Sequence, residues 1–234
     1  MSIEPLILLP GLICDERLFG PQLPALRAVT EVSVADLTHA DSTALMAEQV
    51  LAKAPPRFAL AGLSMGGYVA LQVMRLAPER VTRLALLDSQ SRPDTPESTA
   101  RRHALIEVAM SEGMLAVADR FLPLFFHPDR VGERALVETA RGMAEAVGPA
   151  AFVRQQHALM GRPDMRPTLE HIACPTLVLA GRQDVLTPVE VQEEMASKIL
   201  DATLVLLPKC GHLSTLERPQ AVTGAMLTWL GAVG

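Results

Sequence analysis

The sequence feature that most constrains the fold is a serine flanked by glycines, in the stretch GLSMG at residues 62–66. The apolar residues before it are typical of a buried strand, and those after it recur at helical spacing. A serine on a tight turn between a strand and a helix brings the two backbones together, so side chains two positions away would collide. Gly62 and Gly66 remove those side chains. The stretch predicts a strand–turn–helix unit that lifts the Ser64 hydroxyl above a sheet.

Strand-like and helix-like segments alternate along most of the chain. Ser42 suits the N-cap of a helix that Pro55 and Pro56 would end. The strands are almost wholly apolar, as expected for strands covered on both faces. This pattern predicts the α/β class, with a doubly wound, mostly parallel sheet of about six strands. Strands are expected at 3–9, 31–37, 58–63, 81–87, 176–180 and 203–207, and further helices at 65–77, 188–200 and 219–229.

The alternation stops between residues 89 and 171, where apolar residues recur only at helical spacing. We therefore expect a helical cap at 91–166, inserted after the fourth strand. The rest of the chain, 1–90 and 167–234, would form the core. No linker, internal repeat or block of charge marks another boundary, so the 234 residues predict one domain with an insertion.

The expected cap holds four of the six phenylalanines of the chain. They predict an apolar substrate pocket above Ser64, although each of them could instead attach the cap to the core. The methionines of the cap are expected to pack rather than to recognise a substrate. The phenylalanines are Phe121, Phe125, Phe126 and Phe152, and the methionines are Met110, Met114, Met143 and Met160.

Three side chains of complementary chemistry follow the ends of expected strands. Ser64 follows the third strand, Asp184 follows the fifth and His212 follows the sixth. Because the carboxyl ends of parallel strands share one edge of the sheet, we expect the three to meet there. A serine hydroxyl becomes a good nucleophile when a base takes its proton, and a neutral histidine can do so near pH 7. A carboxylate would orient the imidazole and stabilise its charged form. Asp88, which follows the fourth strand, is the alternative acid.

Acyl transfer also needs donors that are already in place for a negative oxygen. The backbone N–H of Met65, at the start of the expected helix, is one candidate, and that of Leu12, after the first strand, is the other. Only His212 follows a strand at the expected edge. The other histidines, which are expected to be surface or structural residues, are His39, His103, His127, His157 and His171.

Four stretches together resemble the α/β-hydrolase superfamily over nearly the whole chain: LLPG at 8–11, GLSMGG at 62–67, LVLAGRQD at 177–184 and CGH at 210–212. The resemblance is to its serine esterase and enol-lactonase branch. It implies the fold, an acyl-enzyme mechanism, and Asp184 rather than Asp88 as the acid. The chain departs from many relatives in having Pro before Gly11 in place of His. It also starts at the first parallel strand, without an N-terminal hairpin.

The resemblance implies a serine hydrolase, and we expect a carboxylesterase that cleaves small to medium carboxylic esters. The alternatives are an enol-lactone or carbon–carbon bond hydrolase of aromatic breakdown, a thioesterase, a cofactor-free perhydrolase, or a non-catalytic binding protein on the same scaffold, because fold and triad do not choose among them. Arg162, in the stretch GRPD at 161–164, is a candidate for a substrate carboxylate. Pairing with Asp164, or exposure to solvent, is the preferred interpretation of Arg162.

The composition narrows the range of partners. A net charge of −5 argues against a nucleic-acid partner, which would need a basic surface. No apolar stretch approaches the roughly 20 residues of a membrane span, and no signal peptide is recognised. Cys14, Cys174 and Cys210 are odd in number and far apart, which favours free thiols and a cytoplasmic location. We expect no cofactor or metal, a small ester as the one partner, and a monomer or homodimer.

Overall fold

A computed structural model describes residues 3–232. Its centre is one six-stranded sheet in the order β2-β1-β3-β4-β5-β6, in which every neighbouring pair is parallel. The predicted α/β class and the six-stranded parallel sheet are confirmed. The strands are β1 (Leu6–Leu9), β2 (Val32–Val34), β3 (Phe58–Leu63), β4 (Val81–Leu87), β5 (Thr176–Gly181) and β6 (Ala202–Leu207).

The first two strands are shorter than their apolar runs predicted. β2 lies at the edge of the sheet and pairs only with β1, over three residues from Val32 to Val34. An edge strand is defined by its one partner, so β2 ends where the ladder to β1 ends. The central strands β1, β3 and β5 are buried along their whole length, as their apolar sequences predicted.

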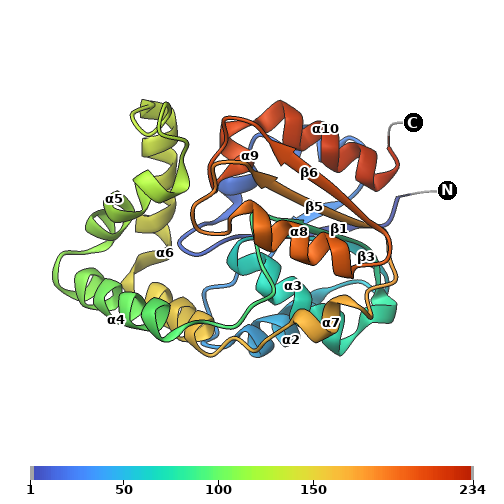
Figure 1. Cartoon of the computed structure of the whole chain (residues 1–234), viewed down its shortest axis with the longest axis horizontal. Coiled ribbons are helices and arrows are strands. Elements are labelled where there is room, and N and C mark those ends of the chain that lie inside the picture. The colour runs from blue at the N-terminus through green and yellow to red at the C-terminus, as the bar shows by residue number, and fades with distance from the viewer. Residues whose placement is uncertain (1–2, 233–234) are drawn as a thin grey trace.

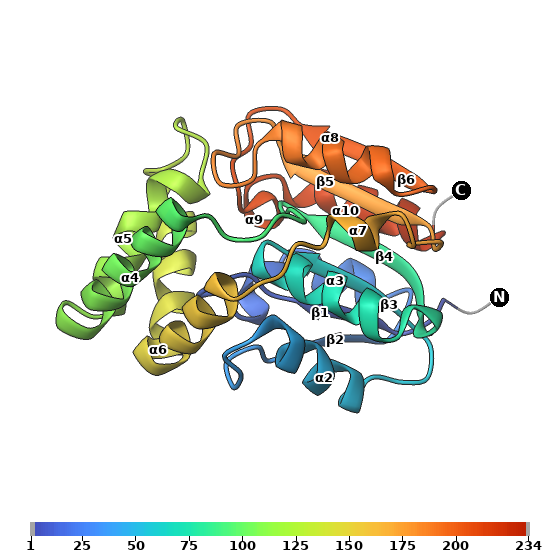
Figure 2. The same ribbon diagram turned by 60° about the horizontal axis from the view of Figure 1, so that its bottom comes forward.

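Helices cover both faces of the sheet (Figures 1 and 2). The Ser42 hydroxyl caps α2 by accepting a hydrogen bond from the Leu45 N–H at 3.2 Å, and α2 ends before Pro55, as predicted. Short turns at Glu16–Phe19, Pro78–Arg80 and Ser214–Glu217 (α9) were not predicted. One face carries α2 (Thr43–Lys53), α3 (Met65–Leu76), α7 (Arg166–Leu169) and α8 (Val189–Lys198), and the other carries α1 (Leu23–Arg27) and α10 (Pro219–Leu230).

The three long helices between β4 and β5 lie together beyond one edge of the sheet (Figure 1). They are α4 (Pro96–Ser111), α5 (Met114–Phe125) and α6 (Arg134–Met160), and they pack on one another. The backbone of α6 breaks at Gly148, whose φ of 73° is left-handed, just before Pro149. We call α4, α5 and α6 the inserted helices. That residues 91–166 form a separable cap stays a prediction.

Of the four methionines predicted to pack, Met114 and Met143 are buried, Met160 is half-buried and Met110 is exposed. Met114 and Met143 are 6% and 1% exposed, whereas Met110 is 68% exposed. The prediction that Met110 packs is therefore wrong, because its position on α4 faces solvent. All three cysteines are free. Within residues 3–232, no helix has the length and apolar character that crossing a membrane requires.

Candidate active site

Ser64 sits on a strained turn between β3 and α3. Its φ of 53° is a left-handed conformation that costs free energy for a residue with a side chain. A Cβ atom added at Gly62 would collide with the carbonyl of Gly66, and one added at Gly66 would collide with the carbonyl of Leu9. Only glycine fits at these two positions, as the sequence predicted. The turn leaves the Ser64 side chain at the carboxyl edge of the sheet.

The structure brings the three predicted side chains together at that edge. The Oγ of Ser64 lies 2.8 Å from Nε2 of His212, and Nδ1 of the same ring lies 2.7 Å from Oδ2 of Asp184. His212 and Asp184 are 2% and 3% exposed, so the contact between them is shielded from water, whereas the contact with Ser64 is partly buried. A serine hydroxyl, an imidazole and a carboxylate thus form one continuous chain of hydrogen bonds, an arrangement that can perform nucleophilic catalysis.

Asp184 is held in place as a charged group. Its Oδ1 accepts hydrogen bonds from the N–H groups of Leu186 and Thr187, at 2.8 and 3.0 Å, and its Oδ2 accepts one from the Thr187 hydroxyl at 2.6 Å. Burial alone would raise the pKa of Asp184, but the charge of His212 and the hydrogen bonds from His212 and Thr187 lower it. In His212, burial acts to lower the pKa, and the charge and hydrogen bond of Asp184 raise it above the ordinary value.

Asp88, the alternative acid, is buried nearby but bonds to other groups. Its Oδ1 accepts the N–H of Gly181 at 3.0 Å, and its Oδ2 accepts the hydroxyl of Ser214. Burial and the charge of Asp184 raise the pKa of Asp88 to about 8. Asp184, rather than Asp88, therefore makes the hydrogen bond to His212, in agreement with the preferred interpretation of the sequence.

The inserted helices hold the loop that carries His212. The carbonyl oxygen of Phe125, at the end of α5, accepts hydrogen bonds from the N–H groups of His212 and Leu213, at 2.8 and 3.0 Å. The Phe125 ring stacks on the imidazole, with centroids 6.0 Å apart. The buried carboxylate of Glu217 accepts the N–H of Gly211 at 2.5 Å and that of His127 at 2.9 Å. These contacts were not predicted from the sequence, because no local pattern marks them.

The two predicted donor amides both lie beside Ser64. Leu12 lines the same cavity as Ser64, and a Cβ at neighbouring Gly11 would lie 3.4 Å from the Ser64 Cβ. Met65 is the first residue of α3, where backbone N–H groups lack helical acceptors and favour negative charge. The N–H groups of Leu12 and Met65 donate to no acceptor among the described residues. Both amides are therefore available to a bound oxygen.

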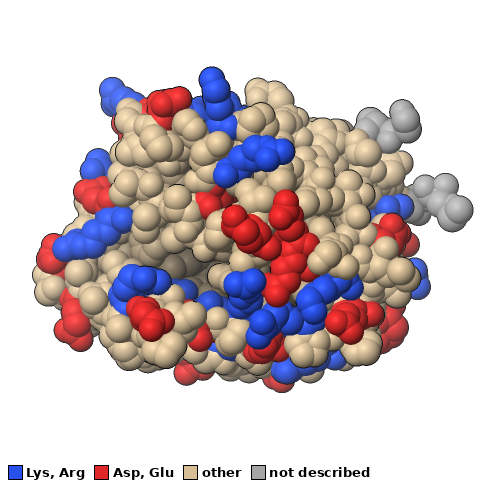
Figure 3. All heavy atoms as spheres, viewed as in Figure 1, with Lys and Arg blue, Asp and Glu red and all other residues tan. Residues whose placement is uncertain are grey.

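A cavity of about 240 Å³ opens above Ser64 and His212. Figure 3 shows the surface hollowed between the inserted helices and the rest of the molecule. Phe121 and Phe125 line this cavity. Phe126 and Phe152 do not line it, and both are buried in the packing of the molecule, at 2% and 0% exposure. Two of the four phenylalanines predicted for the pocket thus serve the core, which was the alternative interpretation for each.

The surroundings of Arg162 differ from those expected from the sequence. Its side chain is 5% exposed, and its Nη1 lies 2.7 Å from Oδ1 of Asp94. Asp164 pairs instead with Arg166. The interpretation that Arg162 pairs with Asp164 or lies in solvent is therefore wrong. Helix packing brings it to a carboxylate 68 residues away in the sequence.

The other histidines take no part in the cavity. His39 and His127 lie beside the carboxylates of Asp36 and Asp129, at 3.0 and 3.7 Å. Neither they nor the remaining three line the cavity. In the part of the chain that the structure describes, no three His, Cys, Asp or Glu side chains are grouped so as to hold a metal ion.

Comparisons with known proteins identify the family and relatives of similar fold. A family model described as the alpha/beta hydrolase family matches residues 7–225. The chain is 30% identical over 189 residues to a pimeloyl-[acyl-carrier protein] methyl ester esterase of Nitrosomonas europaea, covering 77% of this chain and 74% of that one. Its fold matches a thermophilic esterase from Thermogutta terrifontis, solved with malate bound, with a TM-score of 0.88 and 28% identity over 98% of this chain and 90% of that one. It equally matches an enol-lactonase from Burkholderia xenovorans, with a TM-score of 0.88 and 26% identity over 99% and 92%.

Proposed function

Because the chain belongs to the alpha/beta hydrolase family, we propose that it is a serine hydrolase that cleaves small to medium carboxylic esters. The observation that carries this proposal is the position of the His212 ring, whose two nitrogens lie 2.8 Å from Ser64 Oγ and 2.7 Å from Asp184 Oδ2. A serine, a base and a carboxylate in this order perform acyl transfer in many unrelated folds.

In the proposed reaction, Ser64 Oγ attacks the ester carbonyl while His212 Nε2 takes its proton. The N–H groups of Leu12 and Met65 hold the negative oxygen that forms. His212 then gives the proton to the leaving alcohol, and an acyl-enzyme remains on Ser64. A water molecule, activated by the same imidazole, releases the acid. Asp184 keeps its charge throughout and stabilises the charged imidazole.

The cavity supports a small substrate, and the relatives support an ester. A volume of about 240 Å³ lies just below the range of roughly 300–1,000 Å³ that is typical of small-molecule sites. Two of the relatives named above are esterases. The likeness to an enol-lactonase favours one second candidate, hydrolysis of an enol-lactone, which is an internal ester open to the same chemistry.

Labelling with a fluorophosphonate probe tests the nucleophile. We expect the wild-type protein to be labelled and the Ser64→Ala protein not to be. Ser197→Ala is the matched control, because Ser197 is exposed on α8 and does not line the cavity. Labelling that survives Ser64→Ala, or a wild-type protein that is never labelled, would overturn the proposal and favour a non-catalytic binding protein.

Turnover assays choose among the hydrolase classes. We expect hydrolysis of p-nitrophenyl acetate and p-nitrophenyl butyrate, measured beside an enol-lactone, an acyl thioester and a dienoic diketone. Clear turnover of the lactone with no turnover of either ester would replace the first candidate with the second. Turnover of the thioester or the diketone alone would contradict both.

A further inference from the structure

One wall of the cavity is basic. Ser98, Arg101, Arg102 and Leu105 all line it. Their spacing of three, four and seven residues places them on one face of α4. Arg162 joins them from the other side of the inserted helices, so three guanidinium groups line the cavity that contains Ser64 and His212. Among the described residues, no carboxylate belongs to this lining.

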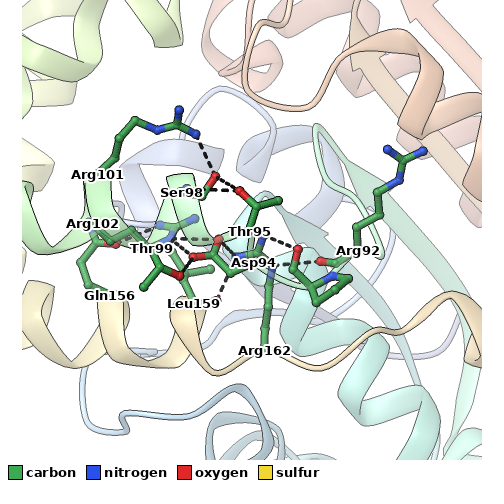
Figure 4. A network of polar contacts seen from close by, with 11 residues as sticks. Arg92, Asp94, Thr95, Ser98, Thr99, Arg101, Arg102, Gln156, Leu159 and Arg162 are labelled. Carbon is green, nitrogen blue, oxygen red and sulfur yellow. Dashed lines mark hydrogen bonds and ion pairs between the residues drawn. The ribbon is translucent and has the colours of Figure 1, made fainter.

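The negative charge near these arginines is too small to balance them. Asp94 is buried behind the wall, with its side chain 2% exposed, and it pairs with both Arg102 and Arg162 at 3.3 and 2.7 Å (Figure 4). One carboxylate thus serves two guanidinium groups. Arg101 contacts the Ser98 hydroxyl at 2.8 Å and forms no ion pair within residues 3–232. Arg101 is exposed, whereas the side chains of Arg102 and Arg162 are mostly buried, at 18% and 5% exposure, and share one carboxylate. An anionic ligand would balance the excess positive charge of this buried group.

The three arginines differ in how many of their N–H groups are already hydrogen-bonded. Arg162 donates from all three of its nitrogens, whereas Arg101 and Arg102 each have at least one nitrogen that donates to no described residue. In Arg162, Nε donates to the carbonyl oxygen of Arg92, and Nη2 donates to that of Pro93. Nη1 donates to Asp94 and to the carbonyl oxygen of Leu159. Arg162 therefore joins the inserted helices to the loop after β4.

Arg102 bonds through Nε to Asp94 and through Nη1 to Gln156 at 2.9 Å, and its Nη2 donates to no described residue. Arg101 donates a hydrogen bond only from Nη2, to the Ser98 hydroxyl, among the described residues. Free guanidinium N–H groups on two adjacent arginines suit a carboxylate, which accepts paired hydrogen bonds.

A second part of the cavity lining is apolar. Phe121, Leu124 and Phe125 of α5 form it, together with Val185 and Leu186 from the loop that carries Asp184. The cavity thus offers a cationic wall and an apolar wall, with the Ser64–His212 pair at its base. Its volume of about 240 Å³ leaves room for a short carbon chain and one small anionic group.

We infer that the substrate is a short ester or lactone that itself carries a carboxylate, which Arg101 and Arg102 bind while its ester carbonyl lies at Ser64. This inference rests on the proposed hydrolase function and names the class of substrate for it. The carboxylate fixes the orientation of the substrate, and the apolar wall covers its carbon chain.

Two nearly isosteric substrates test the inference. Monoethyl succinate carries a carboxylate where ethyl succinamate carries a neutral amide. One charge-assisted contact contributes enough that we expect kcat/KM to be about 10- to 100-fold higher for monoethyl succinate. Equal values, or a preference for the amide, would overturn the inference.

Arginine variants locate the effect. Arg101→Gln and Arg102→Gln should each lower the ratio of the two kcat/KM values by about 10-fold or more. Arg134→Gln, on the exposed surface of α6, should leave the ratio unchanged. Arg102 is partly buried against Asp94, so its replacement can disturb folding. Arg101 is exposed and does not touch Asp94, so a ratio unaffected by Arg101→Gln in a folded protein would contradict its role.

Binding measurements separate this inference from the proposed function. Calorimetry with succinate and with succinamate on the Ser64→Ala protein reports the arginine site without any turnover. If succinate binds more tightly but no ester is cleaved by the wild type, the proposed hydrolase function fails and the anion site stands. If neutral esters are cleaved and succinate binds no better than succinamate, the anion site fails and the hydrolase function stands.

Discussion

The edge of the sheet and the inserted helices meet at one cavity, but they are built in different ways. At the sheet edge, Ser64, Asp184 and His212 each lie within a few residues of a strand end, and the sheet holds the strand ends in register. Around the inserted helices, the polar groups lie within the helices or just outside their ends, and find partners far along the chain, as Arg162 does with Asp94. The difference suggests that the sheet sets the reaction and the inserted helices set which substrate is accepted.

The largest effect is expected at the sheet edge. Ser64→Ala and His212→Ala should each lower kcat for an ester by about a million-fold, and the double variant by little more, because such residues act as a unit. Steady-state kinetics measure the loss, and thermal unfolding should show that both proteins remain folded. Loss of kcat by less than about 100-fold in either variant would mean that the three contacts are not the catalytic machinery.

Replacement of a buried aspartate by asparagine is expected to have the next largest effect on kcat, and the effect should differ between Asp184 and Asp88. Asp184→Asn should lower kcat by about 10,000-fold, because the amide no longer stabilises the charged imidazole or its correct tautomer. Asp88→Asn should have a much smaller effect, since Asp88 bonds to Gly181 and Ser214 instead of His212. Parallel kinetics on the two variants check the order. A larger loss of kcat for Asp88→Asn would show that Asp88, rather than Asp184, orients the imidazole.

Among the inserted helices, the strongest expected effect is on stability. Asp94→Asn leaves the buried guanidinium of Arg162 without its carboxylate, so the free energy of unfolding should fall by about 3–5 kcal/mol. Urea unfolding measures the change. Asp119→Asn is the matched control, because its ion pair with Arg141 is exposed to solvent and should contribute almost nothing. An equal loss in the two variants would show that burial of the Asp94 pair has no special weight.

The smallest expected effect is a shift in the pH profile. His212 must be neutral to take the proton of Ser64, so kcat rises as pH passes through the pKa of His212. Burial lowers that pKa and Asp184 raises it, with a net rise above the ordinary 6.5. The midpoint of the rise should therefore lie above pH 6.5, and Asp184→Asn should move it to lower pH. A midpoint that stays in place in the variant would contradict the coupling of the two groups.

Much of the sheet edge could be predicted because each feature there is local in sequence. The six strands were found from apolar runs, and the turn at Ser64 from its two glycines. The errors at β1 and β2 arose because the length of an apolar run does not report where a neighbouring strand stops. The catalytic roles of Ser64, Asp184 and His212 remain predictions, for which the two contacts of the His212 ring supply the geometry.

The sequence by itself determined the class of fold and the residues that would stand at the carboxyl edge of the sheet, because strand periodicity and turn chemistry act over a few neighbouring positions. Only the tertiary structure decided that the Phe125 carbonyl and Glu217 hold the His212 loop, that Arg162 is buried against Asp94, and which phenylalanines line the cavity. These contacts depend on how helices cross and rotate against one another. That arrangement follows from the packing of many side chains at once, and no single stretch of sequence records it.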